Sequence, residues 1–283
     1  MRIDLHTHST ASDGTDAPSE LVREAREAGL DVVALTDHDT FGGWAEAVDA
    51  LPAGLTLVRG AELSCRLGHI SLHLLALLPD PDDAELAQEM ALSRDDRVPR
   101  AREMVRRLAE DGWPVSWESV LAQTAGEGTS IGRPHIADAL VAGGAVPDRS
   151  AAFADILHSR SRYYVPHHAT DPVRAVRLVR AAGGVPVFAH PHARRRGPVV
   201  DDGTIAAMAE AGLAALEVDH RDQDDADRAH LRGLAGDLGL LTTGSSDFHG
   251  EGKPNRLGEN GTDREVYEAL LAQVRSGVEP VRG

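Results

Sequence analysis

Apolar runs of strand length alternate with amphipathic segments of helix length along most of the chain. Leu30–Thr36 is a largely apolar run typical of a strand buried on both faces, whereas Ala17–Ala28 carries its apolar residues at helical spacing and ends at Gly29. The pattern predicts seven strands, at Ile3–His6, Leu30–Thr36, Leu55–Glu62, Ser71–Leu78, Val185–Ala189, Leu213–Val218 and Leu240–Gly244. It predicts helices between them at Ala17–Ala28, Phe41–Ala50, Asp171–Ala182, Thr204–Ala211, Asp224–Leu238 and Asp263–Ser276.

One long segment, from Asp82 to Val165, departs from this alternation. It is rich in arginine and reads as mostly helical, with helices expected at Val98–Gly112, Ser116–Ala125 and His135–Ala142. We interpret it as an insertion, so the chain divides into residues 1–81, 82–165 and 166–283. The first and third parts then hold seven β/α units. Such units imply parallel strands, which right-handed crossovers can close into a barrel; an open doubly wound sheet is the competing fold.

Histidine and carboxylate side chains recur where the predicted strands end. His6 and His8 stand at alternate positions at the end of the first strand, so both imidazoles point to the same side. In a β/α barrel the carboxyl ends of all strands surround one mouth, where active sites are built. We therefore expect one shared site from His6, His8, Asp13, Asp37, His38, Asp39, Glu62, His73, His190, Glu217, Asp219, His220, Asp247 and His249.

The residue types at this mouth indicate bound metal. Imidazoles mixed with carboxylates suit Mn²⁺, Zn²⁺ or Fe²⁺ rather than Ca²⁺, and the single cysteine, Cys65, argues against a thiolate zinc site. The nine best candidates are too many for one ion, so we expect two or three divalent ions, with Mn²⁺ preferred. These are His6, His8, Asp13, His38, Glu62, His73, His190, Asp247 and His249. Such a pocket would be cationic and would suit a substrate that carries phosphate.

Composition limits the other partners. The formal net charge of −16 argues against a broad surface for long duplex nucleic acid, which would be basic. No apolar run is long enough to span a bilayer, and no signal peptide is recognisable. Together with the single cysteine, these features predict a cytoplasmic protein with no membrane association. No obligate protein partner is evident in the sequence.

Seven short motifs resemble those of the PHP (polymerase and histidinol phosphatase) family. The resemblance implies a distorted seven-stranded β/α (TIM-like) barrel with a trinuclear metal centre. It implies that His6, His8, Glu62 and Asp247 hold one ion, that Asp13, His38 and His249 hold a second, and that Glu62, His73 and His190 hold a third. The motifs are His6-Thr7-His8, Ser12-Asp13-Gly14, Thr36-Asp37-His38, Glu62-Leu63-Ser64, His73-Leu74-Leu75, Ala189-His190-Pro191 and Ser246-Asp247-Phe248-His249.

The insertion narrows the resemblance to a subgroup of nucleotide phosphoesterases. Its segment Ile131-Gly132-Arg133-Pro134-His135-Ile136-Ala137 is similar to that of proteins in which a helical cap covers the barrel mouth. Members of this subgroup remove the 3′-phosphate of nucleoside 3′,5′-bisphosphates or trim short 5′-phosphorylated RNA in the 5′→3′ direction. The resemblance implies that Arg133 and His135 contact substrate phosphate.

Four further interpretations concern single positions. We expect Asp37 and Asp39 to orient imidazoles rather than to bind metal. His73 lies in an apolar strand, so a core histidine is its alternative reading. We expect the Arg194-Arg195-Arg196 run to be a solvated loop, with contact to a trailing phosphate as the alternative. His220 is a candidate proton donor, as are His135 and a water.

The expected reaction is hydrolysis of a phosphoester by a metal-activated hydroxide, with Glu62, Asp247, His249 and His220 in the catalytic machinery. Arg133 and the ions would stabilise the charge on phosphate. A histidinol-phosphate-type phosphomonoesterase and a metal hydrolase acting on amide or phosphonate bonds are rival enzymes. A non-catalytic PHP module that binds nucleotide or metal is the rival from another class.

Overall fold

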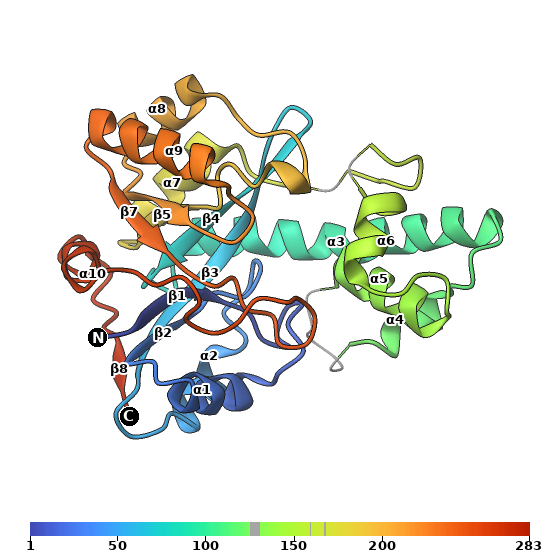
Figure 1. Ribbon diagram of the computed structural model, residues 1–283, viewed down its shortest axis with the longest axis horizontal. Helices are drawn as coiled ribbons and strands as arrows, with labels where there is room; N and C mark the ends of the chain where they lie inside the picture. Colours follow the sequence, from blue (N-terminus) through green and yellow to red (C-terminus); the bar gives the residue numbers. More distant parts are fainter. Residues whose placement is uncertain (125–130, 159, 167) are drawn as a thin grey trace.

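The computed structural model describes residues 1–124, 131–158, 160–166 and 168–283, and its core is one curved sheet (Figure 1). Seven strands follow one another across the sheet in chain order. His8 donates its backbone N–H to the carbonyl oxygen of Phe248 at 2.9 Å, so the two edges meet and the barrel is nearly closed. The predicted distorted seven-stranded barrel is confirmed, and the doubly wound alternative is wrong. The strands are β1 (Ile3–Thr7), β2 (Val32–Leu35), β3 (Thr56–Leu67), β4 (Ile70–Leu77), β5 (Val185–Ala189), β6 (Ala215–Asp219) and β7 (Leu241–Gly244).

Strand β4 runs antiparallel to both of its neighbours, β3 and β5, which corrects the expectation of parallel strands throughout. Only Gly68 and His69 separate β3 from β4. A connection of two residues can close only a hairpin, because a parallel crossover needs a dozen residues or more. Gly68 adopts a φ of +58°, which such a turn favours.

Helices cover the outside of the sheet with their apolar faces. In α1, for example, Leu21, Val22 and Ala25 are fully buried, and the Glu20 side chain accepts a hydrogen bond from the backbone N–H of Ala17 before the first turn. The short strand β8 (Val281–Arg282), which pairs antiparallel with β3, was not predicted. The outer helices are α1 (Pro18–Glu27), α2 (Trp44–Asp49), α7 (Pro172–Ala181), α8 (Asp202–Glu210), α9 (Asp225–Leu238) and α10 (Arg264–Leu271).

The described residues between β4 and α7 form four helices, and the first of these is much longer than the sequence pattern indicates. Leu86 and Met90 of α3 pack in a hydrophobic cluster with barrel strands and α7, whereas Met104 and Leu108 pack with Ile136 of α5. Figure 1 shows α3 extending from the barrel to the group of shorter helices. The helices are α3 (Ala84–Glu110), α4 (Trp117–Leu121), α5 (Arg133–Ala142) and α6 (Arg149–Asp155).

Two details of this segment differ from the prediction. Helix α4 ends at Leu121, and residue 125, where we expected its end, lies outside the described residues. Helix α6 was not expected from the sequence. Within the described ranges, no helix has both the length and the apolar character needed to cross a membrane.

Candidate active site

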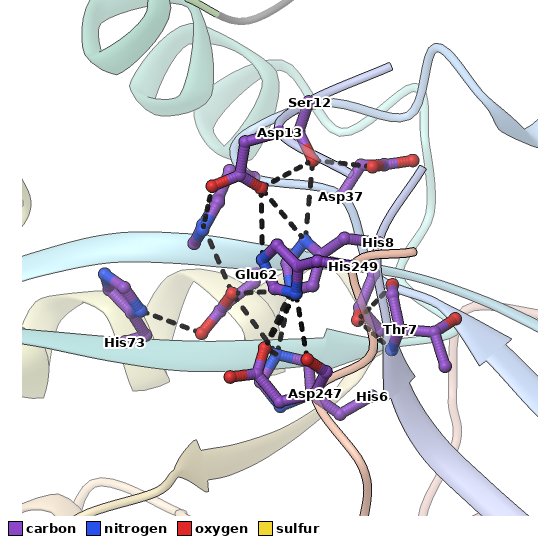
Figure 2. Close-up of polar contacts among 12 residues, drawn as sticks. His6, Thr7, His8, Ser12, Asp13, Asp37, Glu62, His73, Asp247 and His249 are labelled. Carbon is purple, nitrogen blue, oxygen red and sulfur yellow. Dashed lines mark hydrogen bonds and ion pairs between the residues drawn. The ribbon is translucent and has the colours of Figure 1, made fainter. Parts of the chain in front are cut away.

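The structure brings the nine predicted metal ligands into one buried cluster at the barrel mouth. Each comes from the end of a strand, from the loop after it, or from the β3–β4 hairpin. Figure 2 shows His6, His8, Asp13, Glu62, His73, Asp247 and His249 gathered in one place. His190 and Asp247 adopt φ values of +33° and +53°, a region that costs a non-glycine residue free energy and that recurs at functional sites.

Four side chains, those of His6, His8, Glu62 and Asp247, converge in the first group. The Nε2 atoms of His6 and His8 lie 3.0 Å apart and stand 3.2 and 3.1 Å from Glu62 Oε2. Asp247 Oδ1 lies 3.5 Å from each of these nitrogens. Side chains so close together can place their donor atoms around one ion.

The second group adjoins the first through His8 and adds Asp13, His38 and His249. Asp13 Oδ1 lies 3.3 Å from His249 Nε2, and Asp13 Oδ2 lies 3.7 Å from His38 Nε2. The His8 and His249 rings are 4.1 Å apart between centroids. Three imidazoles and one carboxylate are therefore available to a second ion.

Glu62 joins these groups to a third. Its Oε1 lies 2.8 Å from His73 Nδ1 and 3.2 Å from His190 Nε2, while its Oε2 lies 3.2 Å from His38 Nδ1. The His73 side chain is 25% exposed, so it is not part of the core. One carboxylate thus faces both sides of the cluster, the position that a bridging ligand requires.

The hydrogen bonds in this pocket fit bound metal better than they fit an empty polar core. Four ring or carboxylate atoms of the predicted ligands are buried and lack a hydrogen-bonding partner of proper geometry in the part of the chain that the structure describes. Because unpaired buried polar atoms are costly, this set fits divalent ions as the missing partners. The atoms are Glu62 Oε2, His38 Nδ1, His73 Nδ1 and His249 Nε2.

The charges of the side chains in the pocket also fit the binding of divalent ions. Burial opposes the ionisation of Asp13, but the charges of His249 and His38 outweigh it and hold its pKa well below the usual value. Burial lowers the pKa of His249 to about 4, helped by the nearby Lys253. Ionised carboxylates and neutral imidazoles are the forms that bind metal. The carboxylates also raise the pKa of His8 to about 9 against the opposing effect of burial, so the pocket attracts positive charge.

Glu217 forms hydrogen bonds that hold two of the predicted ligands, His6 and His190. Its carboxylate lies 2.9 Å from His6 Nδ1 and accepts the backbone N–H of His190 at 2.9 Å. Because His6 donates from Nδ1, its Nε2 lone pair points into the cluster. Glu217 was expected at the mouth as a carboxylate at the end of a strand, but no specific role there was predicted for it.

Asp37 and Asp39 act differently from the expectation. Asp37 accepts hydrogen bonds from the side chains of Ser9 and Ser12 at 2.7 and 2.6 Å, so it reaches His8 only through Ser12. Asp39 accepts hydrogen bonds from Ser64 and Arg97. Both carboxylates therefore fix the loops of the mouth rather than bind imidazoles directly.

Two cations that sequence reasoning missed meet at Asp247. Arg196 Nη2 donates to Asp247 Oδ2 at 2.6 Å, and Lys253 Nζ donates to the same oxygen at 3.0 Å. The expectation that Arg194–Arg196 is only a solvated loop is therefore wrong for Arg196, which the short helix η1 (Arg194–Arg196) turns inward. In the sequence nothing separates Arg196 from its two neighbours, and nothing marks Lys253 except that it is the one lysine.

The two predicted substrate contacts lie on α5. Arg133 donates to the carbonyl oxygen of Leu157, and its guanidinium lies over the rings of Phe153 and Tyr164. None of the contacts found for Arg133 among the described residues involves a metal-cluster side chain. His135 is buried and accepts a hydrogen bond at Nδ1 from the backbone N–H of Gly132.

Helix α6 connects this segment to the mouth. Arg149 pairs with both carboxylate oxygens of Asp138 and donates to the backbone oxygen of Asp13 at 3.1 Å. Asp13 is a member of the second metal group. The helical segment is therefore attached directly to the loop that carries a predicted ligand.

Comparison with known proteins agrees with this geometry. Residues 4–83 match the PHP domain. The chain is 33% identical to the 3′,5′-nucleoside bisphosphate phosphatase of Chromobacterium violaceum, over 90% of this chain and 89% of that protein. It is 30% identical to the 5′-3′ exoribonuclease Rnm of Escherichia coli, over 87% and 84% respectively.

Among solved structures, the chain is similar to a protein from Bifidobacterium adolescentis that is assigned as a metal-dependent phosphoesterase. The two share 42% sequence identity with a TM-score of 0.91, and the match covers 96% of each chain. The clustered imidazoles and carboxylates, the barrel that presents them and these relatives lead to one assignment. The chain belongs to the PHP family, in the subgroup of nucleotide phosphoesterases, and it is a metal-dependent hydrolase of phosphoric esters.

Proposed function

We propose that the protein hydrolyses phosphate esters of nucleotides, namely the 3′-phosphate ester of nucleoside 3′,5′-bisphosphates, the phosphodiesters of short 5′-phosphorylated RNA, or both. The observation that carries the proposal is the convergence of Arg196 and Lys253 on the edge of the metal cluster, at Asp247 Oδ2. A phosphate that entered there would meet two cationic donors. The relatives named above support nucleotides as the substrate class.

The nine clustered ligands would hold two or three divalent ions, and we propose Mn²⁺, with Zn²⁺ or Fe²⁺ as alternatives. When bound, such ions polarise the phosphoryl oxygens and make water acidic enough to attack phosphorus near neutral pH. Glu62, Asp247 and His249 would bind these ions and fix their positions at the barrel mouth. Arg196 and Lys253 would bind the non-bridging phosphate oxygens, on which negative charge persists during the reaction.

His220 is the proposed hydrogen-bond donor to the leaving oxygen. Its Nδ1 accepts a hydrogen bond from the backbone N–H of Asp222 at 3.0 Å, so the ring hydrogen of the neutral imidazole is on Nε2. That Nε2 atom lies 3.4 Å from Asp247 Oδ2 and is one of the buried atoms without a hydrogen-bonding partner. A neutral ring cannot give up this hydrogen without becoming an anion, so we propose that His220 stabilises the leaving oxygen by a hydrogen bond and that a water supplies the proton.

Two residues of α5 complete the proposal. The Nδ1 atom of His135 is occupied by Gly132, so its Nε2 carries the hydrogen of the neutral ring and can donate to phosphate. Arg133 has no carboxylate partner among the described residues, which leaves its charge available to a substrate anion. We propose that both contact the phosphate that is not hydrolysed.

The test is an assay with Mn²⁺ that measures inorganic phosphate released from adenosine 3′,5′-bisphosphate, mononucleotides released from a short 5′-phosphorylated RNA, and inorganic phosphate released from histidinol phosphate. We expect release from the first two. Release from histidinol phosphate alone would favour a histidinol-phosphate-type enzyme, and no release from any of them, with metal bound, would favour a non-catalytic module.

A matched pair of variants tests the cationic edge of the cluster. Arg196→Met should lower kcat/KM by roughly 10²- to 10³-fold, the effect typical of losing one charge-stabilising donor. Arg195→Met removes the same charge from an exposed neighbour in the same turn and should leave kcat/KM unchanged. Equal effects of the two substitutions would remove Arg196 from the proposed site.

A further inference from the structure

A second imidazole–carboxylate cluster lies outside the active centre, where the segment between β5 and α8 meets two helices. His192 follows β5, Asp202 is the first residue of α8, and His230 lies in α9. Each of the three side chains offers a donor atom within 4.8 Å of the others. Figure 1 shows α8 and α9 side by side on the outside of the barrel.

The His192 side chain is already held in place as a metal-binding imidazole would be. Its Nδ1 lies 3.1 Å from Asp227 Oδ1, and its backbone N–H donates to Gln223 Oε1 at 2.8 Å. A carboxylate on one ring nitrogen fixes the imidazole and leaves the other nitrogen, Nε2, for an ion. His192 is 3% exposed, so this orientation is maintained by packing.

The other two donors face His192 from the surface. The His192 and His230 rings stack with centroids 5.4 Å apart and an interplanar angle of 11°. His230 Nε2 lies 2.8 Å from Asp202 Oδ1. The helix cap of α8 is provided by the neighbouring Asp201, which accepts the backbone N–H of Thr204, so Asp202 is not needed for capping.

From this arrangement we infer that His192, Asp202 and His230 form a second, peripheral site for one transition-metal ion of the Zn²⁺ class. Two imidazoles and one carboxylate provide three ligands, and water completes the tetrahedron that Zn²⁺ prefers. The same residues line a surface hollow of ≈ 610 Å³, which gives an ion and its water access. The donor types disfavour Ca²⁺ and Mg²⁺, which take oxygen ligands.

An ion at this peripheral site would affect the segment that carries Arg196. The segment that begins with His192 continues into η1, where Arg196 reaches Asp247. An ion at the peripheral site would join this segment to α8 and α9 and would restrict the turn that presents Arg196. Without an ion, His230 and Asp202 form only an exposed pair, and such pairs contribute little to stability.

The experiment compares zinc bound by the full chain and by three variants. Each protein is loaded with Mn²⁺, exposed to Zn²⁺, freed of unbound metal and analysed for zinc per chain. His230→Ala and Asp202→Asn should each bind one zinc ion fewer than the unmodified protein. His69→Ala, which removes an exposed histidine from the β3–β4 turn, should bind the same amount as the unmodified protein.

A second variant measures affinity. Asp227→Asn keeps all three ligands but weakens the partner of His192 Nδ1, and it should lower zinc affinity about 10- to 100-fold. Zinc that enters the active centre does so in every variant and cancels in the comparison. Equal zinc in the unmodified protein and in both ligand variants, with circular dichroism showing that all are folded, would overturn the proposal. An equal loss in His69→Ala would overturn it as well.

Discussion

His6 and His220 both face the metal cluster, but their hydrogen bonds give them opposite tautomers. His6 donates from Nδ1 to Glu217 and presents a lone pair, whereas His220 accepts at Nδ1 from a backbone N–H and presents a hydrogen. The partner of the remote ring nitrogen therefore decides which imidazole binds metal and which donates a hydrogen bond. Residue type alone carries no such information.

Replacing Glu217 tests this dependence. Glu217→Gln keeps the shape of the side chain but loses the charge that holds the His6 tautomer, so metal affinity should fall about 10- to 100-fold. Metal retained in competition with a chelator measures the change. Glu210→Gln, an exposed substitution at the end of α8, is the control and should retain metal like the unmodified protein. Equal retention by all three proteins would contradict the role of Glu217.

Sequence reasoning brought the ligands together but missed the cations beside them. Alternation in a strand puts His6 and His8 on one side, and barrel topology gathers the strand ends, so both inferences need only periodicity. Arg196 reaches the site through a short helical turn whose direction depends on tertiary contacts with Asp222 and Asp247. No local pattern encodes that direction.

At the scale of elements, α3 shows where local signals mislead. We expected a helix that starts at Val98, where Pro99 would lie in the first turn, yet the helix runs from Ala84 through Pro99. An internal proline removes one hydrogen bond, a cost that packing can outweigh. Here Met90 packs on the barrel side of Pro99 and Met104 on the other side, so burial at both ends supports one continuous helix.

Helix α6 should depend on the ion pair that its first residue, Arg149, forms with Asp138. Arg149→Met leaves Asp138 without its partner and breaks the bond to the Asp13 backbone, so we expect a loss of about 1–3 kcal/mol in the free energy of unfolding. Urea denaturation measures it, and hydrogen exchange should quicken in α6. Arg106→Met, which removes exposed pairs on α3, should cost less than about 1 kcal/mol. Equal costs would show that Arg149 is not an anchor.

Tyr267 in helix α10 should make the folded protein less stable at alkaline pH. Burial raises the pKa of Tyr267 to about 12, which favours the neutral phenol in the folded state. This contribution is complete below the unfolded pKa of about 10 and is lost as the pH rises toward 12. The free energy of unfolding should therefore fall more between pH 9 and pH 11 in the unmodified protein than in Tyr267→Phe. Parallel pH profiles would contradict this assignment.

At the scale of the whole molecule, an acidic chain encloses a pocket lined by ionised carboxylates. Burial opposes the charges of Glu62 and Asp247, but neighbouring cationic groups keep the pKa of each well below its usual value. The protein carries a formal charge of −16 around this pocket. Bound divalent ions should therefore stabilise the fold as well as the reaction.

Metal removal tests this coupling. A chelator should abolish phosphate release and lower the melting temperature, since a ligand at 1,000 times its Kd contributes about 4 kcal/mol per site. Added Mn²⁺ should restore both properties, and chelator already saturated with Ca²⁺ serves as the control. An unchanged melting temperature after complete removal of metal would show that the bound ions do not stabilise the fold.

The contact between His6 and Glu217 joins residues 211 positions apart, and Asp247 lies farther still along the chain. At roughly 5–20 residues per second, a ribosome needs about 10–40 s to proceed from His6 to Glu217, so an emerging chain holds His6 and His8 before their partners exist. The first metal group, which includes Asp247 from the loop after β7, can therefore be complete only after β7 has docked beside β1. Ions in this group would then stabilise only a chain whose synthesis has passed β7. A chain truncated before Asp247 would lack one of their ligands and would bind them more weakly.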